Sequence, residues 1–260
     1  MANPNLSTAL LSTTYFGPIQ WYQKLNRYDL CVIEQFDNFQ KQTYRNRCRI
    51  ATANGSQVLT VPVERTEGKC LMRDVRISDH GAWRHLHWNA LQSAYGESPF
   101  FEFYADDLHP FFERRWTFLL DFNMDITNKL CELLDIHPRL SLTTNYLPPT
   151  SGEEEKSFRK EEKTLGEEEK SFGKEEKKLG EQEKSFGKGE KKLGEDEKSR
   201  EEKEPFIDFR EAIHPKHPLP DADFAPRPYY QQHAPRHGFQ PNLSILDLLF
   251  NEGNEAIFFL

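Results

Sequence analysis

The sequence of 260 residues lacks the features of a membrane or secreted protein. No stretch approaches the ~20 consecutive apolar residues that a transmembrane helix needs. The first residues, MANPNLSTALLSTTYF, have neither the basic start nor the long apolar run of a signal peptide. The cysteines lie far apart without C-x-x-C spacing, which favours a reducing compartment and argues against a structural zinc site. We therefore expect a cytoplasmic protein that does not insert into a membrane.

The motifs of several large enzyme classes are also missing. The sequence contains no G-x-S-x-G, no G-x-G-x-x-G, no phosphate loop that ends in GK[ST] and no H-E-x-x-H. Hydrolases, dinucleotide oxidoreductases, P-loop enzymes and zinc proteases therefore lose support. His85 and His87 are two residues apart and diverge on a helix, and His80 and the Asp106, Asp107 and His109 group have no completing ligand pattern. We predict no metal site, and the sequence leaves the cofactor open.

Neither the charged middle segment nor the rest of the chain has an overall excess of basic residues. Residues 153–204 hold 19 acidic and 15 basic side chains, and the other 208 residues hold 23 and 19, so each part carries a net charge of −4. Without a basic field, we expect neither a nucleic-acid partner nor attraction to an anionic membrane.

A charged tandem repeat occupies the middle of the chain. Its fourteen-residue units are GEEEKSFRKEEKTL, GEEEKSFGKEEKKL and GEQEKSFGKGEKKL, starting at Gly152. Each heptad supplies one apolar residue where a coiled-coil seam needs two, and each interior glycine costs a helix roughly 1 kcal/mol. We predict that residues 151–204 are a flexible insertion within one α/β domain formed by residues 1–150 and 205–260. A segment that docks a partner protein is the alternative.

The remaining sequence predicts an α/β fold. Residues 9–13 and 30–36 are expected to be strands and residues 19–28 a helix, which makes a β-α-β start with a parallel pair. Asn54-Gly55 predicts a hairpin between residues 47–53 and 57–63. We expect one mixed sheet with helices packed on it. Further strands are expected at 72–77 and 140–144, and further helices from Trp83 to Tyr95, from Pro110, at 123–136 and at 243–251.

The first candidate site follows the second predicted strand. Its members are polar or cationic, and they are Gln35, Asp37, Lys41, Tyr44, Arg45, Asn46, Arg47 and Arg49. Ligands of α/β sheets bind beyond the carboxyl ends of strands, and arginines in this density suit a bidentate grip on phosphate or carboxylate. The alternative is a solvated loop that enters an edge strand.

Two helices carry the remaining candidates. Trp83, His87 and Tyr95 share one face of a helix, where a histidine serves either as a general base or as a buried core residue. Asp247 lies in the apolar final helix, in line with Ser244 and Asn251. A carboxylate there is either a structural brace or a site residue.

Taken in order, several segments resemble the bacterial WbqC-like family. They are STTYFGPIQWYQK at 12–24, YRNRCRI at 44–50, ANGSQVLTVPV at 53–63, the Trp83/His87/Tyr95 helix, DFREAIHPK at 208–216, YYQ at 229–231 and FQPNLSILDLLFNEG at 239–253. The repeat looks like an expansion of a family loop. This chain departs from many relatives by having Ser12-Thr13-Thr14 where they carry a His-Gln-Pro triplet.

The resemblance implies a role in surface-polysaccharide synthesis, with transfer of an amino-acyl group such as glycyl onto a nucleotide-linked amino sugar as the proposed activity. On this hypothesis Arg45 and Arg47 hold the phosphates, Gln35 and Asn46 orient the sugar, and His87 or Asp247 moves the proton. The other residues expected to bind substrate are Tyr44, Trp83 and Tyr95. The alternative is a noncatalytic binding or assembly protein that keeps the family pocket, with the repeat as a spacer or docking segment.

Overall fold

The computed structural model of the protein describes residues 7–65, 67–149 and 206–260. The chain divides into two units, residues 1–147 with 205–260 and residues 148–204. The insertion predicted at 151–204 lies outside the described residues. In the described ranges, no helix combines the length and the apolar character needed to cross a membrane.

Four short strands form a parallel sheet in the order β5-β2-β1-β6. They are β1 (Thr8–Ser12), β2 (Leu30–Glu34), β5 (Leu140–Leu142) and β6 (Phe206–Asp208). Ala9, Leu10 and Leu11 are fully buried, as expected for a central strand that is covered on both faces. Helix α1 (Ile19–Arg27) joins β1 to β2, which confirms the predicted β-α-β start.

The hairpin of β3 (Arg47–Thr52) and β4 (Gly55–Thr60) is a second, antiparallel sheet. Gly55 has a φ of 106°, which supplies the left-handed conformation at the turn. The α/β class with a parallel sheet and an antiparallel hairpin is confirmed, but the strands form two sheets rather than one mixed sheet. The outer edge of β3 is already occupied, because Arg49 O accepts a hydrogen bond from Ser244 N and Ala51 N donates to the Tyr95 hydroxyl.

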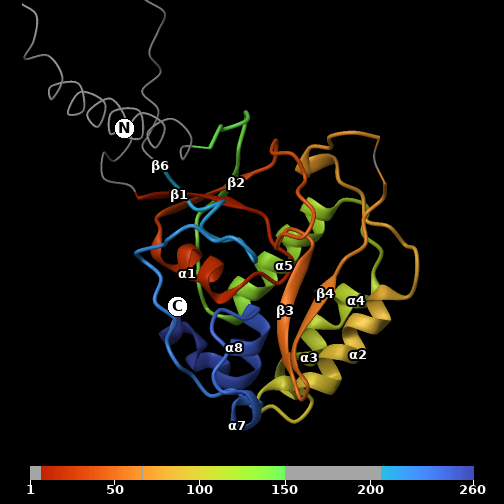
Figure 1. Ribbon diagram of the computed structural model, residues 1–260, viewed down its shortest axis with the longest axis vertical. Coiled ribbons are helices and arrows are strands. Elements are labelled where there is room, and N and C mark those ends of the chain that lie inside the picture. The colour runs from red at the N-terminus through yellow and green to blue at the C-terminus, as the bar shows by residue number, and fades with distance from the viewer. Residues whose placement is uncertain (1–6, 66, 150–205) are drawn as a thin grey trace, which may run out of the picture. The chain divides into compact units, whose positions relative to one another are not determined.

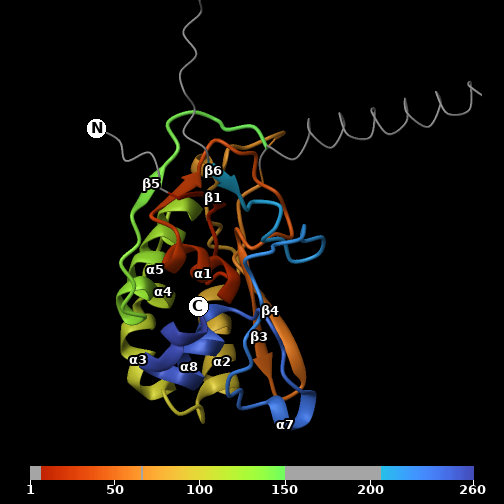
Figure 2. The ribbon, with the colours of Figure 1, turned by 90° about the vertical axis from the view of Figure 1, so that its left-hand side faces the viewer.

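After the hairpin, helices occupy the four predicted places, but the one expected at 123–136 spans residues 119–133, and two further helices, at 101–108 and 234–237, were not predicted. These helices are α2 (Trp83–Tyr95), α3 (Phe101–Leu108), α4 (Pro110–Glu113), α5 (Leu119–Leu133), α7 (Ala234–His237) and α8 (Ile245–Glu252). The hairpin runs alongside α2, and α7 lies at its tip in both views (Figures 1 and 2), where His237 Nε2 is 2.9 Å from Ala53 O. The final 3₁₀ segment, η3 (Gly253–Phe259), closes the chain.

The strand expected at residues 72–77 is wrong. Met72–Asp74 form a 3₁₀ turn, η1, and the following residues make only isolated bridges. The alternation of the sequence has another cause, because Met72, Val75 and Ile77 bury their side chains in the core while their neighbours stay exposed.

Residues 242–244 pack against the beginning of the chain. Asn242 Oδ1 accepts a hydrogen bond from Gln20 N at 3.0 Å and Leu243 O accepts from Ile19 N at 3.0 Å, which satisfies two N–H groups at the start of α1. Ser244 caps α8 with its own hydroxyl and donates to Phe16 O. Residues from both sides of the insertion therefore build one core and one sheet edge.

Candidate functional site

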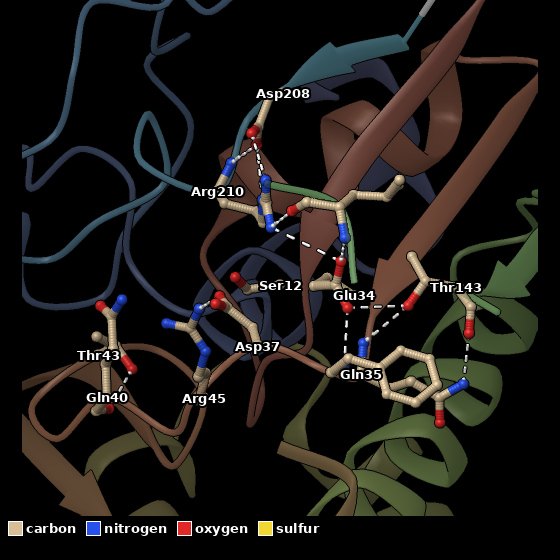
Figure 3. Close-up of polar contacts among 12 residues, drawn as sticks. Ser12, Glu34, Gln35, Asp37, Gln40, Thr43, Arg45, Thr143, Asp208 and Arg210 are labelled. Carbon is tan, nitrogen blue, oxygen red and sulfur yellow. Dashed lines mark hydrogen bonds and ion pairs between the residues drawn. The ribbon is translucent and has the colours of Figure 1, made fainter. Parts of the chain in front are cut away.

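Polar side chains gather where three parallel strands end. β1 ends at Ser12, β2 at Glu34 and β6 at Asp208, and Figure 3 shows these ends beside the loop that carries Asp37 and Arg45. In open α/β sheets, ligands bind outside the carboxyl ends of the strands. This edge of the sheet is therefore the place in the fold where a site is expected.

Arg210 organises the buried centre of this edge. It donates from Nε and Nη2 to the two carboxylate oxygens of Asp208 at 3.0 and 2.7 Å, and from Nη1 to Leu147 O at 2.8 Å. The same Nη1 lies 3.8 Å from Glu34 Oε2 (Figure 3). Burial opposes the charge of Arg210, but Asp208 and the neighbouring carboxylates raise its pKa. Through these three hydrogen bonds and the ion pair with Glu34, Arg210 holds the strand ends together.

Glu34 and Gln35 fasten β2 to the segment after β5. Thr143 Oγ1 donates to Glu34 Oε1 at 2.9 Å, and Leu147 N donates to Glu34 Oε2 at 2.9 Å. Gln35 Nε2 donates to Thr143 O at 2.6 Å. Gln35, predicted to orient a sugar, thus lies at the sheet edge with its amide nitrogen bound to the backbone.

Arg45 is the cation at this edge that keeps free donors. Its guanidinium is buried, and Nη2 donates to Asp37 Oδ2 at 2.8 Å. Burial lowers the pKa of Arg45, and Asp37 counteracts this effect, so that the guanidinium remains charged at neutral pH. Among the described residues, Asp37 is the hydrogen-bond partner of its side chain, and Arg45 also lines a cavity.

That cavity lies between the end of β1 and the loop before β3. Its polar lining comes from Arg45, Arg210, Tyr44 and a group of hydroxyl residues, which are Ser12, Thr13, Thr14 and Thr43. It has room for about one water molecule or one small polar group. The hydroxyl oxygens of Ser12, Thr13 and Thr14 are buried without a hydrogen-bond partner among the described residues. Buried hydroxyls in proteins are nearly always bonded, so these three are available to a polar group, water or ligand, that occupies the cavity.

Asn46 and Arg47 leave the sheet edge and enter the hairpin. Asn46 is buried and donates from Nδ2 to Val61 O at 2.8 Å, which ties the start of β3 to the end of β4. Arg47 is half-buried in β3, and Arg49 donates to Pro241 O at 3.1 Å. The cluster expected from the sequence is therefore divided: Gln35, Asp37, Tyr44 and Arg45 lie at the sheet edge, whereas Lys41 lines a neighbouring cleft.

His87 lies inside the core between α2 and the hairpin. Its Nδ1 is 2.9 Å from the Tyr15 hydroxyl, and its ring packs edge-on against Trp83 at 5.2 Å. Burial lowers the pKa of His87 to about 4, opposed by a hydrogen bond to the backbone of Thr60. A neutral imidazole with both nitrogens engaged matches the core alternative that the sequence left open.

Asp247 is the centre of a second internal network. Tyr95 donates to Asp247 Oδ1 at 2.9 Å, and Tyr229 and Gln231 donate to Oδ2 at 2.6 and 3.1 Å. Burial raises the pKa of Asp247, and these three hydrogen bonds counteract the effect. Because Tyr95 also accepts from Ala51 N, the network joins α8, α2, β3 and the tail. This geometry favours the bracing role over a catalytic one.

Sequence reasoning missed Glu34, Thr143 and the role of Arg210. Position at the end of a strand could have indicated Glu34, whereas nothing in the sequence indicates that Thr143 faces it. The hydroxyl run Ser12-Thr13-Thr14 was noted as a departure, and the structure places it in the cavity wall. Within the described ranges, no cluster of three His, Cys, Asp or Glu residues is arranged to hold a metal ion.

Comparison with known proteins identifies the family of the chain. The WbqC-like protein family matches residues 13–193 and 220–258, beginning at the cavity residue Thr13. The "Uncharacterized protein Rv1507c" of Mycobacterium tuberculosis (strain ATCC 25618 / H37Rv) is 30% identical over 141 residues. That match covers 53% of this chain and 60% of the relative. No solved structure matches the chain. The family match covers most of the sequence, including the segments before and after the tandem repeat. The chain therefore belongs to the WbqC-like protein family.

Proposed function

We propose that the protein is a transferase that moves an amino-acyl group onto a nucleotide-linked amino sugar, with the reacting end of the ligand in the cavity at the end of β1. The cavity wall carries three buried hydroxyls and a buried arginine. Hydroxyls both donate and accept hydrogen bonds, so they suit the amine and hydroxyl groups of a sugar.

Arg45 supplies the positive charge at this position. In acyl transfer, negative charge develops on the carbonyl oxygen, and a fixed donor in a water-poor site stabilises it. Arg45 is 5% exposed and held by Asp37, so its orientation is set before a ligand arrives. Arg210, which donates hydrogen bonds to Asp208 and to Leu147 O, positions the surrounding strand ends.

The three unpartnered hydroxyls are the observation that carries the proposal. A hydroxyl buried without a partner lowers stability, so replacing it with an isosteric methyl group should be neutral or stabilising. If a ligand uses the hydroxyl, the same replacement weakens binding. For a hydroxyl that binds the ligand, replacement by a methyl group should therefore keep or raise the stability of the free protein while it lowers the affinity for the ligand.

The test uses Thr13→Val in the full chain. We expect a nucleotide-linked amino sugar to raise the thermal midpoint of the wild type in a panel of nucleotide-sugars. Thr13→Val should keep or raise the midpoint of the free protein and bind the same ligand about tenfold more weakly, equivalent to about 1.4 kcal/mol. Isothermal titration measures the affinity.

Thr127→Val is the control, because Thr127 is also a buried threonine but lies in α5 outside the cavity, beside the Tyr22 hydroxyl. It should leave ligand affinity unchanged. Equal affinities of wild type and Thr13→Val, or silence of the whole panel on folded protein, would contradict the proposal.

A noncatalytic binding protein is the second candidate, and the state of the acids at the sheet edge favours it. Glu34, Asp37 and Asp208 are all engaged by protein partners. None of the three is a free base. Mass spectrometry distinguishes the candidates, because a transferase given activated amino acids adds an amino-acyl mass to the bound amino sugar. A binding protein leaves the ligand mass unchanged.

A further inference from the structure

A larger cleft lies between two loops next to the sheet edge. Its volume is about 510 Å³, within the ~300–1,000 Å³ range of small-molecule sites. Residues 38, 39 and 41 form one wall and residues 63–65 and 68–70 the other. By contrast, the cavity at the end of β1 has room for about one water molecule. A ligand larger than its reacting end must therefore extend beyond that cavity.

The cleft is positively charged although the chain as a whole carries a net charge of −8. Lys41, Arg65 and Lys69 line it, against the single acid Glu64. These three cations are exposed, and no ion pair engages them within the part of the chain that the structure describes. Like charges without a counter-charge attract an anionic ligand.

The two walls are held together by backbone hydrogen bonds. Phe39 N donates to Cys70 O at 2.8 Å and Met72 N donates to Asp37 O at 2.8 Å. Asn38 and Leu71 form an isolated bridge. The half-buried Phe39 ring adds an apolar surface to the cleft. The two walls are therefore joined by paired backbone between residues 37–39 and 70–72.

One loop lines both the cleft and the cavity. Residues 38, 39 and 41 face the cleft, whereas residues 43–45 face the cavity. Thr43 Oγ1 donates to Gln40 O at 2.8 Å, and Arg45 is paired with Asp37 at the start of the same loop (Figure 3). Lys216 contacts the Gln42 side chain from the tail, which braces the loop.

We propose that this cleft binds the phosphate groups of a phosphorylated small molecule, with Lys41, Arg65 and Lys69 as the cationic ligands and Phe39 beside them. The assignment rests on the proposed function in that the same ligand reaches the cavity. A second groove, of about 480 Å³, gives an internal contrast because its lining holds one arginine, Arg139, against one acid, Asp29, with the imidazole of His137 beside them. It has no excess of cations, so the charge of the first cleft is specific to that position.

The test measures binding of inorganic pyrophosphate and of UDP to the full chain by isothermal titration. Lys41→Glu/Lys69→Glu reverses two cleft charges. Arg139→Glu/Arg236→Glu makes the same change in net charge at two exposed residues outside the cleft. We expect at least a tenfold loss of affinity in the first pair and less than a twofold change in the second. Raising the salt concentration should weaken wild-type binding.

Each outcome decides between the two proposals. Equal losses in both pairs, or no binding of either probe by the wild type, would overturn the cleft assignment. Phosphate binding that depends on Lys41 and Lys69, without any effect of Thr13→Val on an amino-sugar ligand, would leave the cleft in place and remove the transferase proposal. Amino-sugar binding that depends on Thr13 but not on the two lysines would do the reverse.

Discussion

At the residue scale, the buried polar side chains fall into two kinds. Asp247 and His87 have partners for their polar atoms and join elements of the core. Thr13 and Thr14 have hydroxyls without partners, and they lie at the sheet edge where ligands of this fold class bind. Since buried polar groups are costly when unpaired, the first kind explains stability and the second indicates a ligand.

His87 should make the stability of the protein depend on pH. Its pKa is about 4 in the folded state, where burial disfavours the charged form, against ~6.5 in an unfolded chain. The unfolded chain therefore binds the extra proton, so stability is fully present above pH 6.5 and is lost as pH falls toward 4. Linkage over that range amounts to about 3 kcal/mol.

His87→Gln tests this effect, because a glutamine amide keeps a donor and an acceptor but does not titrate. We expect urea unfolding at pH 7 and pH 5 to show a smaller pH-dependent loss in the variant than in the wild type. Parallel pH dependences in the two proteins would show that His87 does not carry the effect. Carboxylates such as Asp247 titrate in both proteins and cancel in the difference.

Residue roles were predictable where the pattern itself limited the chemistry. A carboxylate in the apolar helix that contains Asp247 has to be paired, and the structure pairs it. Arg45 was expected at the sheet edge. Because it pairs with Asp37, Arg45→Ala would also leave the Asp37 carboxylate without its cationic partner. The contacts of Glu34 with Thr143 join positions 109 residues apart, and no local pattern reports such a distance.

At the element scale, turns and ends explain which predictions succeeded. The hairpin at Asn54-Gly55 and the helix that begins after Pro18 were predicted correctly. Both signals act through local backbone preferences, which the sequence alone shows. The alternating segment 72–77 failed as a strand because burial of Met72, Val75 and Ile77 is satisfied without a continuous partner strand. The spacing of apolar residues therefore identifies which side chains are buried. Whether the segment forms a strand depends on whether a partner strand lies beside it.

Gly253 ends α8 in a conformation that other residues rarely adopt. Its φ is 59° and ψ is −129°, and a Cβ atom would lie 2.7 Å from the Phe100 ring. We expect Gly253→Ala to cost about 1–3 kcal/mol from backbone strain, with the steric contact in addition. Gly81→Ala is the control, because Gly81 has a φ of 76° but open space around its Cβ position. Thermal unfolding should show a larger loss for Gly253→Ala, and equal losses would show that Phe100 yields without cost.

At the scale of the whole molecule, the segments before and after the insertion depend on each other. β6 pairs with β1, and residues 242–244 bind the start of α1 and the edge of β3. Asp221 continues this contact, because it accepts hydrogen bonds from Gln20 and Lys24 of α1. The candidate site has the same property, since Arg210 comes from the tail and Arg45 from the first part of the chain.

Breaking the ion pair between Lys24 and Asp221 should show how strongly the segments before and after the insertion stabilise each other. The Lys24 side chain is 0% exposed, its Nζ lies 2.8 Å from Asp221 Oδ2, and it also lies over the Phe209 ring. Removing one partner of a buried pair leaves an uncompensated charge, so we expect Asp221→Asn to cost about 3–5 kcal/mol. In Lys24→Met/Asp221→Asn both charges are gone, and the double variant should be more stable than the sum of the single losses predicts, by about 1 kcal/mol or more.

Urea unfolding should show one cooperative transition that Asp221→Asn shifts as a whole, because the pair joins parts of the chain on opposite sides of the insertion. Additive losses would show that the pair is not coupled, and a separate early transition would show that the tail detaches before the rest unfolds.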